Sequence, residues 1–307
     1  MSSSPLLSIV TPTRGNFSDR WLASLCAVQG EVEFLLVFPP GEPIKVMADP
    51  RFRIIISPFK GEVFQRLLGL LNASGSYVME LDDDDYLHPQ ILDLIGEYFT
   101  LFPDSWCLRP SMRKIDFDEP DIIYRPWDAI PDLASLKVAA KKTDDQPVLQ
   151  AIAIAPLQNK FDWRFLFSPF LIRKDMKGSH IENFNNKVWK TSLVKTALVD
   201  LSHTMRLFNA LTWIPRWSLD RMLGLYIQAK FFEPNKTVGH WLPAPEQIRY
   251  VKMPSKLKQE LRLILPADAL LAKRFPQYGY FWNLFFEQFW VGLRTIGSHY
   301  NPMNRQR

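Results

Sequence analysis

The stretch Tyr77-Val78-Met79-Glu80-Leu81-Asp82-Asp83-Asp84-Asp85 joins a short apolar run to four consecutive aspartates, and Pro89 follows. Four like charges repel one another, so placing them where a strand ends costs folding free energy unless a cation or backbone donors offset the repulsion. Carboxylate oxygens on a short loop suit Mg²⁺ or Mn²⁺, which complete their shell with water and substrate phosphates. The alternative is a solvated acidic turn, because aspartate commonly caps turns and helix starts.

The first hundred residues alternate between strand and helix patterns. The strand-like runs are continuously apolar rather than alternating, which predicts an α/β fold with a mostly parallel sheet covered by helices on both faces. Ligands of such sheets bind at the carboxyl ends of the strands, where the aspartates fall. The predicted strands are 6–11, 34–38, 52–56 and 77–81, and the predicted helices are 19–28, 62–73 and 89–101.

The pattern weakens after residue 110. Prolines and mixed charges over 111–145 indicate an insertion with a short strand at 122–124. Residues 186–196, 193–201 and 219–231 have helical spacing. The last fifty residues predict helices at 256–265, 267–275 and 278–296.

The segment 278–296 is rich in aromatic residues but contains Asn283, Glu287 and Gln288, so it is too polar to span a membrane. From residue 251 onward the chain has nine Lys and Arg and three Asp and Glu, a net charge of +6. Since the net charge of the whole chain is +5, the remaining residues carry about −1. The segment therefore fits an anionic membrane surface. Packing on the main domain, or on a second copy in a homodimer, is the alternative. No motif geometry supports nucleic-acid binding.

The composition is that of a globular protein, with 47% hydrophobic and 22% charged residues in a chain of 307. Cys26 and Cys107 are too far apart in sequence to form a metal or redox motif, which favours a reducing compartment. The start lacks the pattern of a signal peptide. We expect a cytoplasmic chain, with a peripheral position at the inner face of a membrane left open.

The residues leading to the four aspartates resemble the inverting glycosyltransferases of the GT-A fold, the family-2 type. The consensus of that family is Arg-Asn-x-Gly-Ile-x-x-Ala-x-Gly-Glu-Tyr, then a strand and Leu-Asp-x-Asp-Asp-x-x-x-Pro. The stretch from Arg66 to Pro89 matches it without a gap, and only Leu67 and Ser76 depart. The resemblance covers about residues 6–100 and resumes more loosely over 183–241.

The resemblance implies a GT-A domain over 1–245, followed by a basic, aromatic-rich helical extension over 246–307. Within the domain, 1–110 would be the nucleotide-sugar-binding half, 111–180 the insertion and 181–245 the acceptor and catalytic half. The implied activity is an inverting, metal-dependent hexosyltransferase that moves a sugar from a UDP- or GDP-sugar to a hydroxyl acceptor on a saccharide, a lipid-linked glycan or a cell-envelope glycan.

The resemblance also implies roles for individual residues. The first acid of the Asp-x-Asp sequence would contact the ribose and the third would bind Mg²⁺ or Mn²⁺. Arg66, on an otherwise apolar helix, needs an anionic partner, either a carboxylate or the diphosphate. The donor-binding candidates are Thr11, Pro12, Thr13, Arg14, Arg66, Asp82 and Asp83, and the metal candidates are Asp84 and His240, the latter in Gly239-His240-Trp241.

Asp220 matches the catalytic base of the family, which lies in a Glu-Asp pair before a hydrophobic helix; here Leu219 replaces the Glu. Aspartate is ionised at neutral pH and accepts a proton from a hydroxyl as the reaction proceeds. The alternative role is that of an acid in the first turn of a helix. His180 and Glu182 are candidates for the border of the acceptor site, and Trp163, Phe165 and Phe167 for an acceptor platform or for core packing.

One departure from the family concerns the nucleotide base. Family members end the second strand in acidic residues that contact the base, whereas here Phe38 is followed by Pro39-Pro40-Gly41. Stacking and backbone contacts would then hold the base, or the nucleotide is not uridine, or the donor pocket is lost. The competing hypothesis is therefore a non-catalytic, glycosyltransferase-like binding or scaffold protein.

Overall fold

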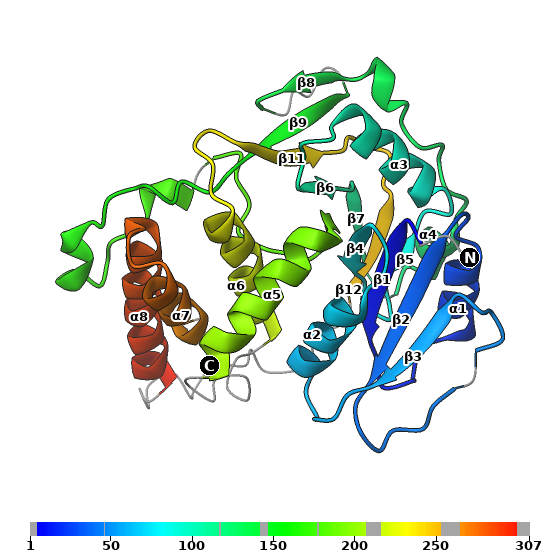
Figure 1. The fold of residues 1–307 in the computed structure, drawn as a ribbon, viewed down its shortest axis with the longest axis horizontal. Coiled ribbons are helices and arrows are strands. Elements are labelled where there is room, and N and C mark those ends of the chain that lie inside the picture. The colour runs from blue at the N-terminus through cyan, green and yellow to red at the C-terminus, as the bar shows by residue number, and fades with distance from the viewer. Residues whose placement is uncertain are drawn as a thin grey trace. The chain divides into compact units, whose positions relative to one another are not determined.

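The computed structural model describes residues 5–45, 47–116, 118–141, 147–176, 178–206, 216–252 and 265–299 (Figure 1). The chain forms two compact units. Unit 1 comprises Met1–Ala153, Asn185–Leu198 and Asn235–Lys256. Unit 2 comprises Ile154–Phe184, Val199–Pro234 and Leu257–Arg307. It therefore takes parts of the predicted insertion and catalytic half and most of the predicted extension, whose residues 246–256 belong to unit 1.

A large sheet forms the centre of unit 1. Five of its eight strand pairings are parallel, and β10 runs antiparallel to both of its neighbours. The expected mostly parallel α/β architecture is confirmed. The strand order is β3-β2-β1-β4-β10-β6-β11-β9-β8, with β1 Leu7–Pro12, β2 Val32–Phe38, β3 Phe52–Ile56, β4 Tyr77–Glu80, β6 Cys107–Arg109, β8 Lys137–Ala139, β9 Val148–Ala153, β10 Val188–Lys190 and β11 Thr237–Trp241.

Helices cover both faces of this sheet. On one face Gly69 of α2 (Glu62–Asn72) lies against Val10. On the other face, the hydroxyl of Tyr98 of α3 (Ile91–Leu101) forms a hydrogen bond with His240 of β11. Successive side chains of a strand point to opposite faces of the sheet, and this places His240 on the face away from α2. The remaining elements of unit 1 are α1 Asp19–Cys26, α4 Pro120–Tyr124, η1 Leu133–Ser135, the first half of α5 Thr191–Arg206, and a small sheet of β5 Tyr86–Leu87, β12 Ile248–Lys252 and β7 Met112–Asp116.

Two helix or strand predictions are wrong, and a third falls mostly outside the described residues. The strand expected at 122–124 is part of the helix α4, which Pro120 begins because proline suits the first helical position. The helix expected from residue 186 begins only at Thr191, since Val188–Lys190 forms β10 between β4 and β6. Most of the helix expected at 256–265 lies outside the described residues.

Unit 2 is built from helices and short turns: α6 Arg216–Lys230, α7 Leu265–Arg274, α8 Gly279–His299, and the 3₁₀ turns η2 Trp163–Leu166 and η3 Lys174–Met176. The aromatic segment expected at 278–296 forms α8. Its Tyr280, Phe281 and Leu284 are fully buried, which supports the packing alternative for this face. Among the described residues, no helix combines the length and apolar character needed to cross a bilayer.

Gly69 is required because α2 approaches the sheet closely. A Cβ atom there would lie 2.3 Å from Val10 Cγ1 and 3.1 Å from Val37 Cγ2. We predict that Gly69→Ala lowers the unfolding free energy by about 1–3 kcal/mol through overpacking. Gly96 of α3 is the control, because its Cβ would meet nothing nearer than Leu6 Cδ2 at 3.8 Å. Gly96→Ala should stabilise by up to about 1 kcal/mol. Equal effects in denaturant titrations would contradict this account.

Candidate functional site

The four aspartates form a tight turn directly after β4. The backbone N–H of Asp85 donates to the carbonyl of Asp82 at 3.1 Å, which closes the turn. Asp85 is almost fully buried, and its Oδ1 accepts the backbone N–H of Val251 on β12 at 3.3 Å. Its carbonyl accepts the indole N–H of Trp21 on α1 at 2.9 Å. The turn is therefore held in place by α1 and β12 of unit 1.

Three of the four carboxylates converge. Asp82, Asp84 and Asp85 each offer an oxygen atom, and these atoms lie within 4.8 Å of one another. Oxygen-only ligand sets at this spacing fit a hard divalent cation such as Mg²⁺ or Mn²⁺. The predicted ligand Asp84 belongs to this acidic group, and of Asp83 and Asp85, either of which was expected to assist it or to turn outward, Asp85 is in the group.

Arg66 of α2 ties the first aspartate in place. Its guanidinium donates to Glu62 at 2.7 and 3.0 Å, to Glu80 of β4 at 2.9 Å, and to Asp82. Burial by itself would lower the pKa of Arg66, but the charges of Glu80, Asp82 and Glu62 outweigh it and raise that pKa well above its ordinary value. Of the two partners expected for Arg66, the structure shows the carboxylate.

Thr13 connects the end of β1 to the same turn. Its hydroxyl donates to Asp83 Oδ2 at 2.7 Å and accepts the backbone N–H of Gly15 at 3.0 Å. Burial raises the pKa of Asp83, and the hydrogen bond from Thr13 opposes this while the charge of Asp82 adds to it. Because β1 and β4 are parallel neighbours, their carboxyl ends meet at one edge.

The other donor-binding candidates of β1 differ in exposure. Thr11 and Pro12 are buried in the strand, and Arg14 is exposed. The hydroxyl of Thr11 has no hydrogen-bond partner among the described residues. Only Arg14 therefore offers an exposed side chain from this part of the candidate site.

His240 does not belong to the acidic group. It lies on β11, is 4% exposed, and bonds through Nδ1 to the hydroxyl of Tyr98 at 2.8 Å. The ring of Phe102 lies 4.5 Å from the imidazole, centroid to centroid. Burial lowers the pKa of His240 to about 4. The imidazole is therefore a neutral core group under α3, and we do not retain it as a metal ligand.

Arg109 and Trp241 form a pair that the sequence analysis missed. They end the parallel neighbours β6 and β11 in register, and the guanidinium carbon lies 3.8 Å from the indole centroid. In the described part of the chain, no carboxylate pairs with Arg109, and the buried indole N–H of Trp241 has no acceptor. Trp189 of β10 pairs with Val78 of β4 on one side and with Cys107 of β6 on the other. Two residues further along these strands, Arg109 of β6 is therefore level with Glu80 of β4, and two strand spacings separate them by about 10 Å.

Asp220 lies in unit 2, in the second turn of α6. Its Oδ1 accepts the backbone N–H of Phe184 at 2.7 Å. Gly224 allows this contact, because a Cβ there would lie 2.4 Å from the carbonyl oxygen of Glu182. Leu219 is buried, so the residue that replaces the family's Glu contributes to packing. Asp220 is therefore held by another segment of unit 2 rather than acting in the first turn of its helix.

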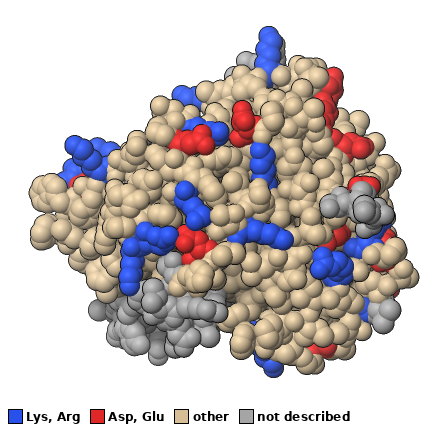
Figure 2. Space-filling model, in the orientation of Figure 1, with Lys and Arg blue, Asp and Glu red and all other residues tan. Residues whose placement is uncertain are grey.

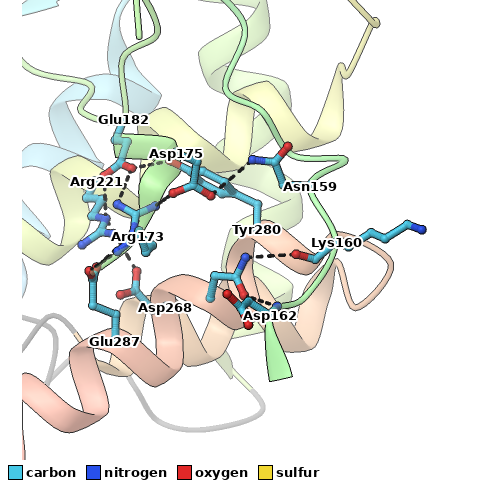
Figure 3. A network of polar contacts seen from close by, with 11 residues as sticks. Asn159, Lys160, Asp162, Arg173, Asp175, Glu182, Arg221, Asp268, Tyr280 and Glu287 are labelled. Carbon is cyan, nitrogen blue, oxygen red and sulfur yellow. Dashed lines mark hydrogen bonds and ion pairs between the residues drawn. The ribbon is translucent and has the colours of Figure 1, made fainter. Parts of the chain in front are cut away.

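The other acceptor-site candidates divide between core and surface. Glu182 is bound by Arg173, Arg221 and Tyr280 in a buried charged network, which is a structural role (Figure 3). Phe165 is buried, whereas Trp163 and Phe167 are exposed.

No protein-family model and no curated protein matches the sequence. Among solved structures, residues 1–349 of S. aureus TarS in complex with UDP-GlcNAc superpose with a TM-score of 0.50 at 13% identity, covering 87% of this chain and 65% of that chain. The chain shares the fold of TarS. Residues 1–349 of TarS, in a second structure, give a TM-score of 0.47 at 14% identity over 96% and 75% of the two chains. The superposition on the UDP-GlcNAc complex confirms the predicted GT-A fold, and this chain spans 65% of that TarS chain.

The burial of His240 predicts a pH dependence of stability. The unfolded chain protonates this residue near pH 6.5, whereas the folded chain does so only near pH 4. As pH falls between these values the unfolded state binds the extra proton, so His240 costs up to about 3 kcal/mol of stability. His240→Gln should remove this loss, so that its stability relative to the wild type improves from about pH 7 to about pH 4.5. If denaturant titrations show the same difference in unfolding free energy between His240→Gln and the wild type at both pH values, the burial of His240 is contradicted.

Proposed function

We propose that this chain is an inverting, metal-dependent glycosyltransferase that moves a hexose from a nucleotide-diphosphate donor to a hydroxyl acceptor. The observation that carries the proposal is the convergence of Asp82, Asp84 and Asp85 at the carboxyl end of β4, in a fold shared with TarS, whose structure contains UDP-GlcNAc. Carboxyl ends of strands are where α/β sheets bind ligands.

The groups proposed to bind the donor lie in unit 1. Asp84 and Asp85, with Asp82, would hold Mg²⁺ or Mn²⁺, which when bound neutralises charge on the departing diphosphate. Arg66 donates to Asp82 and fixes its orientation. Thr13 orients Asp83. Arg66 engages Oδ1 of Asp82, and we assign Asp82 and Asp83 to the ribose, with Asp82 between the ribose and the cation.

Arg109 supplies a positive charge at the same edge of the sheet. Its guanidinium stacks on Trp241 and pairs with no carboxylate of the described residues, so the pair is preorganised for an anion. We assign Arg109 to the diphosphate, the role that Arg66 does not fill because three carboxylates already surround it.

Asp220 is the proposed base. Its carboxylate accepts the proton of the acceptor hydroxyl while that oxygen forms a bond to the anomeric carbon and the bond to the diphosphate breaks on the opposite face. The hydrogen bond from the Phe184 N–H to Oδ1 orients this carboxylate. Such a single displacement inverts the anomeric configuration.

The nucleotide base stays open between uracil and guanine. Phe38, at the end of β2, is fully buried, and a Cβ on Gly15 would lie 3.1 Å from its ring. The ring therefore belongs to the core and does not offer a stacking surface. Backbone groups beyond β2 are the remaining partners for the base.

Release of nucleotide from a panel of UDP- and GDP-sugars with Mn²⁺ tests the activity. The wild type should turn over one donor class, and Asp84→Asn should lower turnover about a hundredfold or more. Asp220→Asn should lower kcat by about 10²–10⁴-fold and leave donor affinity unchanged. Asp93→Asn, an exposed acid on α3, is the matched control. Absence of calorimetric binding of any nucleotide diphosphate with Mn²⁺ would favour the scaffold alternative instead.

Arg109→Gln should weaken calorimetric binding of the nucleoside diphosphate about ten- to a hundredfold, the range expected for losing a hydrogen bond to a charged group. Arg109→Lys keeps the charge and should lose less, although it loses the planar stacking on Trp241. Arg294→Gln, an exposed arginine on α8, is the control. Unchanged affinity in Arg109→Gln would remove Arg109 from the site.

A further inference from the structure

Residues 161–172 of unit 2, which we call the aromatic loop, expose large apolar side chains in close succession. Trp163 is 65% exposed, Phe167 75%, Phe170 78% and Ile172 74%. Isolated exposed apolar residues are ordinary, but a contiguous group marks an interaction surface. The loop belongs to the green segment at the left of Figure 1, and in Figure 2 Lys and Arg side chains lie beside an uncharged projection at the left of the view.

The first end of the loop is bound to α8. The side chain of Asn283 accepts the backbone N–H of Asp162 at 2.8 Å and donates to the carbonyl of Lys160 at 3.2 Å (Figure 3). The indole of Trp290 donates to the carbonyl of Phe165 at 2.6 Å, and Phe165 itself is buried. Phe165 therefore packs in the core, whereas Leu166 and Phe167, which follow it, are exposed.

The second end is bound by Arg173, whose side chain is 3% exposed. Its guanidinium lies 2.9 Å from both Glu182 and Glu287, and its backbone N–H donates to Glu287 at 3.1 Å (Figure 3). Breaking a buried ion pair of this kind costs several kcal/mol, so this end stays in place. The apolar side chains between the two anchors are therefore held outward by a fixed backbone and do not fold back into unit 2.

Exposed charges around the loop are mainly positive. Lys160, Arg164 and Lys174 are exposed. Asp162 pairs with Arg164 at 2.6 Å, and Asp175 lies 3.3 Å from Arg173. The loop therefore combines projecting aromatic rings with exposed lysines at its two ends.

We propose that the aromatic loop inserts into the interfacial region of an anionic lipid bilayer. Trp and Phe rings favour the headgroup region, and basic side chains next to them are attracted by anionic lipid. A two-fold dimer through the same loop would bring two loops with an excess of exposed positive charge together, which is unfavourable, and interface cores are depleted in charge. The bilayer contact therefore belongs to this loop rather than to the buried face of α8.

Vesicle flotation of the full chain tests the proposal. The wild type should float with phosphatidylglycerol vesicles and much less with phosphatidylcholine vesicles, and added salt should weaken binding. Phe167→Ser/Phe170→Ser should weaken binding about tenfold or more, because each ring loses its apolar transfer free energy. Ile56→Ser/Phe59→Ser, at residues 55% and 59% exposed in unit 1, is the matched control and should float as the wild type does.

Lys160→Glu/Lys174→Glu separates the contribution of charge to vesicle binding from that of ring insertion. This variant should lose the preference for phosphatidylglycerol over phosphatidylcholine vesicles. Circular dichroism and melting temperatures unchanged from the wild type show that the variants fold. The proposal is overturned if the wild type stays in the soluble fraction with both vesicles, or if Phe167→Ser/Phe170→Ser floats as well as the wild type. Sedimentation that shows a dimer lost in that variant would assign the loop to a second copy and also overturn it.

Discussion

The guanidinium of Arg66 is the interaction on which the candidate site depends. It lies between Glu62 of its own helix, Glu80 of β4 and Asp82 of the acidic turn. One buried cation therefore offsets part of the charge of three carboxylates and joins α2 to the strand that precedes the turn. Without it, these carboxylates would add to the repulsion among the aspartates, and a buried charge left unpaired costs several kcal/mol. Gly69, one turn further along α2, gives the close approach to the sheet that places Arg66 there.

The sequence predicted the first half of unit 1 well because its signals are local. The strands β1 to β4 are continuous apolar runs, and α1 to α3 have clear helical spacing, so their positions follow from neighbouring residues. β6 and β10 have three residues each, and their pairing depends on partners far away in the chain. A run as short as Val188–Lys190 beside a helix is indistinguishable from the first turn of that helix.

Residues of the candidate site could be predicted from the sequence only where they belong to a recognisable motif. Asp84 follows from the Asp-x-Asp pattern, but Arg109 and Trp241 meet through a strand register that spans most of the chain. A local signal for Arg109 existed, an arginine that ends the apolar run Cys107-Leu108, but it carries no information about its partner. His240 was misassigned because the sequence places a residue on a strand without saying which helix covers its face. Burial under α3 then decided its role.

The central claim is that the acidic group after β4 holds one divalent cation, and Mn²⁺ binding measured by the paramagnetic resonance of free Mn²⁺ tests it most directly. With UDP or GDP present, we predict one site per chain in the wild type and in Asp93→Asn. Asp84→Asn should weaken this site about tenfold or more, since it removes a charged ligand at a group of only three carboxylates. Equal Mn²⁺ binding by Asp84→Asn and wild type, or no binding by the wild type, would contradict the account.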